Sequence, residues 1–154
     1  MSGIPPFKPY VPDRNLMFGE AVVMTATGNV QFAAADVILK IGRGRMDATL
    51  ILNITTMKVS ATNELYDFWI QGCDVSDFSG GASGIVNLAH VQVGAVAALS
   101  AGAGISGGVG ARVELDFNNV LVGNAMYDYI RLRAVIAGTA PTITFDAWVA
   151  VDAE

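Results

Sequence analysis

The sequence predicts an all-β protein: an antiparallel β-sandwich of the jelly-roll type, with about eight strands and an extended N-terminal arm. From residue 19 onward, apolar and polar residues alternate with a period of two, as they do on strands with one buried and one solvated face. Gly and Asn separate these runs, and no amphipathic helical pattern lies between them. The chain of 154 residues has the length of one domain, which we place at residues 19–154.

Residues 1–18 are predicted to form a proline-rich arm. Prolines at positions 5, 6, 9 and 12 are incompatible with a helix interior or a central strand. The apolar side chains of the arm are too numerous for a solvated linker. We therefore expect the arm to be extended and to anchor the domain to a neighbouring subunit, with the affinity concentrated in Phe7, Tyr10 and Phe18.

Eight strands follow, each rich in β-branched or aromatic residues. We place them at 20–27, 36–41, 47–59, 65–73, 85–93, 111–118, 127–137 and 142–152. The last three alternate most cleanly, and their apolar faces are expected to fill the core: Val113, Leu115, Phe117, Ile130, Leu132, Ile136, Ile143, Phe145, Val149 and Val151. The Gly-rich segment 94–110 is predicted to be a long loop, either a flexible connection or a contact loop that orders against a partner.

The composition limits the classes of function. Hydrophobic residues make up 53% of the chain and charged residues 15%, against about 25% charged in ordinary soluble domains. This balance indicates a large interior or an apolar surface that a partner covers. The net charge of −5 argues against nucleic-acid binding. The uncharged segment 78–111 is rich in Gly, Ala and Ser rather than bulky apolar residues, so we expect no membrane span, and residues 1–12 lack the pattern of a secretory signal.

The residue types that catalysis requires are scarce. The single histidine, His90, shares the parity of Val86 and Leu88, and the single cysteine, Cys73, ends another strand. Neither has neighbours that suggest a nucleophile or a base. Three acidic residues, Asp67, Asp74 and Asp77, lack the spacing of a calcium loop and are better explained as turn residues. We expect no enzymatic activity, no cofactor and no metal.

Four outward-facing residues are candidates for partner binding. Trp69 and Trp148 lie on the polar parity of their strands; each could anchor a protein interface or a sugar, or simply pack against its neighbours. Arg131 and Arg133 stand two residues apart on one strand and could set register or partner choice. If their strands are neighbours, the arginines can meet one of three acidic residues: Glu114, Asp116 or Asp146.

The later strands resemble those of jelly-roll capsid cement, or decoration, proteins of tailed bacteriophages. The matching residues are Gln71, Gly72, Asp74, Phe78, Arg112, Phe117, Asn118, Tyr129 to Leu132, Gly138, Thr139 and Pro141. The resemblance covers most of residues 16–152. It implies a non-enzymatic virion protein that is made in the host cytoplasm, binds the outer capsid surface and clamps adjacent major capsid subunits. It also implies self-association, as a homotrimer in preference to a homodimer.

The same strands allow a second interpretation. The YIRLR strand with its β-rich C-terminal continuation is also similar to discoidin-type carbohydrate-binding domains. A carbohydrate-binding or adhesion module is therefore the alternative function.

Overall fold

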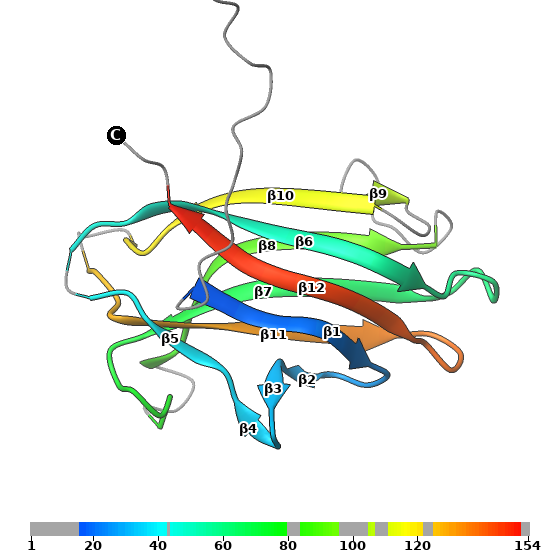
Figure 1. Cartoon of the computed structure of the whole chain (residues 1–154), viewed down its shortest axis with the longest axis horizontal. Coiled ribbons are helices and arrows are strands. Elements are labelled where there is room, and N and C mark those ends of the chain that lie inside the picture. The colour runs from blue at the N-terminus through cyan, green and yellow to red at the C-terminus, as the bar shows by residue number, and fades with distance from the viewer. Residues whose placement is uncertain are drawn as a thin grey trace, which may run out of the picture.

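The computed structural model describes residues 16–42, 44–79, 84–95, 105–106, 111–121 and 125–151. Within these ranges the chain is built from strands that form two main sheets lying face to face (Figure 1). The strands are β1 (Met17–Met24), β2 (Gly28–Asn29), β3 (Gln31–Phe32), β4 (Ala35–Asp36), β5 (Ile38–Lys40), β6 (Asp47–Met57), β7 (Leu65–Cys73), β8 (Val86–Gly94), β9 (Ile105–Ser106), β10 (Ala111–Asn118), β11 (Tyr129–Ala137) and β12 (Ile143–Val151). The predicted all-β class and antiparallel sandwich are confirmed, whereas the jelly-roll connectivity stays a prediction.

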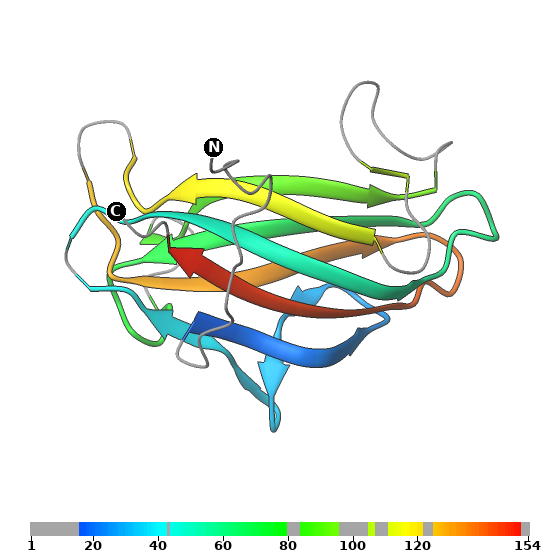
Figure 2. The ribbon, with the colours of Figure 1, turned by 45° about the horizontal axis from the view of Figure 1, so that its top comes forward.

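Strand order assigns each segment to one of the two sheets. The four-stranded sheet has the order β1-β12-β6-β10, and the six-stranded sheet has the order β2-β11-β7-β8-β9, with β5 also pairing with β11. A two-stranded hairpin, β3–β4, lies beside β1 in both Figure 1 and Figure 2. Among the described strands, β8 and β9 form a parallel pair, and the other pairs are antiparallel.

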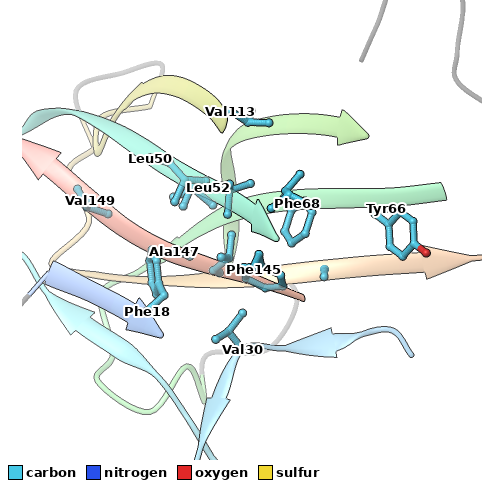
Figure 3. Close-up of a cluster of buried hydrophobic side chains, with 14 of the residues drawn as sticks. Phe18, Val30, Leu50, Leu52, Tyr66, Phe68, Val113, Phe145, Ala147 and Val149 are labelled. Carbon is cyan, nitrogen blue, oxygen red and sulfur yellow. The ribbon is translucent and has the colours of Figure 1, made fainter. Parts of the chain in front are cut away.

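The hydrophobic core lies between the two sheets, where side chains from both inner faces meet (Figure 3). Phe68 on β7 and Phe145 on β12 are in edge-to-face contact, with ring centroids 5.1 Å apart, which is a favourable aromatic geometry. Most of the predicted core is confirmed. The buried members are Val113, Phe117, Ile130, Leu132, Ile143, Phe145 and Val149, while Leu115 and Ile136 are partly buried against them. The prediction for Val151 is wrong: this side chain is 46% exposed because β12 ends there.

The folded domain begins earlier than the predicted boundary at Gly19. Strand β1 starts at Met17, and Leu16 already packs against the core. Phe18 is 1% exposed and belongs to the core cluster, so the prediction that it binds a partner is wrong. Its alternation with Met17 turns its ring toward the interior. Phe7 and Tyr10, the other predicted anchors of the arm, lie outside the described residues.

Three short elements were not predicted. Strand β2 and the β3–β4 hairpin occupy the region between the first two predicted strands. Strand β9 lies within the segment 94–110, where it pairs with Val93 and Gly94 at the end of β8. Part of that predicted loop is therefore sheet, and the other residues between 96 and 110 lie outside the described ranges.

Candidate functional site

The histidine and the cysteine that the sequence singled out lie apart, and His90 pairs instead with Asp67. In the described part of the chain, no three His, Cys, Asp or Glu side chains form a group that could hold a metal ion. Cys73 is a free, buried thiol. His90 lies opposite Trp69 in the β7–β8 pair. Trp69 precedes Cys73 by four residues on β7, a separation of about 13 Å along the strand. The cysteine and the histidine therefore do not form a catalytic pair.

The predicted turn role of Asp77 is visible in the structure. Its Oδ1 accepts a hydrogen bond from the backbone N–H of Ser79 at 2.9 Å. Hydrogen bonds from Ser79 lower the pKa of Asp77 below its ordinary value, because they stabilise the ionised carboxylate. Asp67, by contrast, lies on β7 and binds side chains of β8. The acidic residues of this region thus have different partners.

The outer surface of the six-stranded sheet carries a set of polar and aromatic side chains that we call the polar face. Its members are Asp67, Trp69, Gln71, Asn87, His90, Gln92, Arg131 and Arg133. Trp69 and His90 stack with ring centroids 3.9 Å apart and an interplanar angle of 17°. His90 Nε2 lies 2.6 Å from Asp67 Oδ1, and Gln92 Nε2 donates to the same oxygen at 2.9 Å. These bonds tie β7 to β8 across their outer face.

A β-bulge brings His90 to this face. The register of the β7–β8 pair shifts where Ile70 faces Ala89 and Gln71 faces Asn87. The extra residue between the two pairs interrupts the alternation of β8, so parity does not carry across it. Leu88 packs against the core, while His90 is exposed beside Trp69. The predicted common parity of His90 and Leu88 is therefore wrong.

On the polar face, three neighbours hold the side chain of Arg131 in place. Its Nε donates to Gln71 Oε1 at 2.9 Å, its Nη1 lies 3.7 Å from Asp36 Oδ2, and its guanidinium lies over the Phe78 ring at 4.4 Å. The side chain is only 12% exposed, and burial lowers its pKa below the ordinary arginine value. An arginine in this arrangement fixes the local packing of the sheet and presents little free charge to a partner.

The predicted acidic partners of the two arginines are wrong. Arg133 Nη1 donates to Asn29 Oδ1 at 3.2 Å, and Arg131 binds Gln71 and Asp36 as described. The physical reason is sheet membership: β11 belongs to the six-stranded sheet, whereas β10 and β12, which carry the expected acidic residues, belong to the other sheet. Asp116 instead accepts a hydrogen bond from Thr49 at 2.7 Å.

Trp148 lies on the outer face of the four-stranded sheet, as its parity predicted, yet it is only 6% exposed. It belongs to a small second cluster with Ile51 and Ala150, and Met17 packs against this cluster. The guanidinium of Arg112 lies 6.0 Å from its ring centroid. The indole Nε1 is buried without a hydrogen-bond partner. Trp148 therefore offers little surface to an incoming partner in this structure.

Glu64 is a buried carboxylate in the turn that precedes β7. Burial opposes its ionisation, but the hydrogen bond from the Ala61 N–H, other backbone bonds and the charge of Lys58 together hold its pKa below the ordinary value. Its Oε2 is buried without a hydrogen-bond partner. Gly94 and Gly138 approach its backbone so closely that an added Cβ would lie within 2.6 Å of it. The turn around Glu64 is therefore tightly packed.

Sequence reasoning missed a groove beside the edge strand β1. Its volume is about 1100 Å³, and it is lined by β1, by the β3–β4 hairpin and by the start of β5. We call it the β1 groove; its lining residues are Met17 to Val23, Gln31, Phe32 and Ala35 to Ile38. Phe32 is 79% exposed and Val23 is 62% exposed. The sequence signal was Phe32 itself, an isolated aromatic residue between two predicted strands.

A bulge shapes the edge of this groove. The register between β1 and β12 shifts between Gly19 and Val22, and Ala21 has a φ of 47°. The N–H of Ala21 donates to Asp146 Oδ1 at 2.7 Å. Bulges of this kind protect an edge strand from pairing with another sheet. The β1 groove therefore offers apolar side chains rather than a regular row of backbone groups.

No family model matches the chain, and no curated protein matches it. A search of the described residues for a helix long and apolar enough to span a membrane found none. The function must therefore be argued from the surfaces of the molecule.

Proposed function

We propose that this protein is a non-enzymatic capsid-decoration protein, which binds the outer surface of a tailed-bacteriophage capsid and clamps adjacent major capsid subunits. The observation that carries the proposal is the β1 groove, where Val23 and Phe32 leave large apolar side chains open to solvent. Contiguous exposed apolar surface marks interaction sites. Within the described residues no group of His, Cys, Asp and Glu side chains could hold a metal ion, and Cys73 and His90 lie apart.

The residues that resemble capsid decoration proteins cluster at structural positions of the sandwich. Phe78 lies under Arg131, Gly138 adopts a φ of 118° in the turn between β11 and β12, and Phe117 is buried on β10. Such positions preserve a fold rather than a binding site. The resemblance therefore supports a shared rigid scaffold, and the partner-specific part of the function falls on the exposed surfaces.

A clamp needs a rigid body and at least two contact surfaces. The core between the sheets and the bonded polar face provide the rigid body. The β1 groove and the arm are the two contact surfaces in this proposal, which also includes self-association as a homotrimer in preference to a homodimer. With few charges to desolvate, apolar contacts of this kind assemble at low electrostatic cost.

The alternative, a carbohydrate-binding or adhesion module, has less support from the geometry. Sugar-binding sites of this type need an aromatic ring with an open face. One face of Trp69 is covered by His90, and Trp148 is almost fully buried. Trp148 therefore offers no open ring face, and the half-buried Trp69 ring has one of its two faces covered.

Cosedimentation with capsids assembled without a decoration protein tests the proposal. We expect the wild-type chain and Val75→Ser to pellet with the capsids and Val23→Ser with Phe32→Ser to remain in the supernatant. Val75 is a matched control because it is also an exposed valine, 42% accessible, but does not line the β1 groove. A glycan-array screen runs in parallel. Clear glycan binding without capsid binding would reverse the ranking of the two functions.

A further inference from the structure

We propose that the β1 groove receives the proline-rich arm, residues 1–15, of a second copy of this chain. The inference deepens the proposed function and rests on it in one respect: it assigns the β1 groove and the arm, the two contact surfaces proposed above, to the contact between copies of the chain, so a groove variant would lose capsid binding through loss of self-association. Exchange of arms between copies is a common route to closed homo-oligomers.

The chemistry of the groove matches the arm. The groove presents Val23 and Phe32 to solvent. The charged residues among its described lining are Glu20, which is exposed, and Asp36, which is paired with Arg131. The arm supplies large apolar side chains, Phe7 and Tyr10 among them, in a segment where two basic residues, at positions 8 and 14, outnumber the single acid at position 13. An arm with a net charge of +1 would thus meet the carboxylate of Glu20 while its aromatic rings cover the apolar side chains of the groove.

The shape of the groove also suits a proline-rich occupant. Because β1 is bulged around Ala21, a guest strand could not form a continuous backbone ladder with it. A segment with prolines at positions 5, 6, 9 and 12 could not supply such a ladder in any case. Neither β1 nor the arm can supply a continuous backbone ladder, so the contact between them must rely on side-chain packing. Proline also restricts φ before docking, which lowers the entropy lost on binding.

The length of the arm is sufficient to reach a neighbour. Fifteen extended residues span about 50 Å, whereas the seven residues of β1 that line the groove span about 23 Å. The arm can therefore cross a gap between two copies and still fill the groove.

The attachment point of the arm favours a second copy over its own domain. The arm joins β1 at Leu16, immediately before the strand that lines the groove. To fill its own groove it would have to reverse direction within residues 13–16. The segment that holds the prolines, residues 5–12, favours an extended conformation, so we expect it to lie on a neighbouring copy rather than to fold back on its own domain.

Sedimentation velocity of the full chain is the first test. We expect an oligomer for the wild type and for Val75→Ser, and at least a tenfold higher dissociation constant for Phe32→Ser and for Tyr10→Ser. Phe32 is 79% exposed, so its substitution should leave the fold intact, which circular dichroism checks. A monomeric wild type, or Phe32→Ser with unchanged self-association, would overturn the proposal.

Cross-linking separates exchange from self-occupation. Lys8→Cys and Gln31→Cys are made in separate chains, mixed and oxidised, with each single variant alone as the control for the buried native thiol of Cys73. We expect disulfide-linked pairs that contain one chain of each kind. A further chain carries both Lys8→Cys and Gln31→Cys. If this chain forms disulfide bonds only within itself, the arm occupies its own groove and exchange is refuted.

Discussion

Two phenylalanines define opposite regions of this molecule. Phe145 is 0% exposed and contacts Phe68 between the two sheets, whereas Phe32 is 79% exposed in the β1 groove. The same side chain contributes free energy to folding at the first position, whereas at the second it contributes little to folding and, in the proposal above, acts on association. We therefore expect core substitutions to change the free energy of unfolding, and groove substitutions to change binding while stability is preserved.

Substitutions in the core should have the largest effect on the free energy of unfolding. Phe145→Ala is expected to lower the free energy of unfolding by about 3–5 kcal/mol, and Leu132→Ala by about 2–5 kcal/mol, through lost burial and the cavities left behind. Both side chains are fully buried. Urea denaturation monitored by circular dichroism measures the change. A loss below about 0.5 kcal/mol for both variants would contradict the core assignment.

A crowded turn at the end of the sandwich should give the next largest effect. Gly138 has a φ of 118°, and an added Cβ would lie 2.6 Å from Glu64 Cα. Strain and overpacking predict that Gly138→Ala destabilises the fold by about 2 kcal/mol or more. Gly28→Ala is the matched control, because the nearest atom to its added Cβ is Met24 Cε at 4.0 Å. Equal melting temperatures for the two variants would show that the turn accepts a Cβ at position 138 without strain.

The carboxylate of Glu64 predicts a pH dependence at the same turn. Its folded-state pKa is lowered, so its contribution to stability is present above the ordinary pKa and is lost as the pH falls through the folded value. The wild type should therefore lose stability between about pH 5 and pH 3 more steeply than Glu64→Gln. Denaturant midpoints measured across this range give the pH dependence of stability for each protein. The same pH dependence in the wild type and in Glu64→Gln would contradict the prediction.

The polar face should show a smaller, pairwise effect. Trp69 and His90 stack directly across β7 and β8, so a double-mutant cycle with Trp69→Ala and His90→Ala is expected to give a coupling energy of about 0.5–1 kcal/mol. Capsid binding by both single variants should stay close to that of the wild type. Loss of binding with intact stability would instead make the polar face a contact surface.

The sequence predicted the parts of the fold that are strongly periodic. The strands β6, β7, β10, β11 and β12 lie within two residues of their predicted bounds, because alternation over eight or more residues leaves a clear signal. The two-residue strands of the β3–β4 hairpin cannot show a period. The β1 groove, which this hairpin borders, was therefore not predictable from the pattern.

Other errors came from information that a single sequence does not carry. Parity alone placed Trp69 on the outer face, but it did not reveal that His90 covers one side of the ring after the bulge in β8. It placed Arg131 outward without showing which strands lie in the same sheet. Phe18 was grouped with the arm because of the prolines before it, whereas its own alternation places it in the core. Sheet membership and bulges are tertiary properties, and they decided each of these cases.

The smallest expected change in stability belongs to the groove, and it is the one that tests the opening comparison most directly. Most of the Phe32 ring already contacts solvent, so Phe32→Ser removes little buried area, and the free energy of unfolding should stay within about 0.5 kcal/mol of the wild type. The measurement belongs at protein concentrations low enough to keep the chain monomeric, because self-association would add its own stabilisation to the wild type. At higher concentrations the wild type should gain stability and the variant should not. A loss above about 1 kcal/mol in the monomer would mean that Phe32 supports its own domain, and the two phenylalanines would then serve the same purpose.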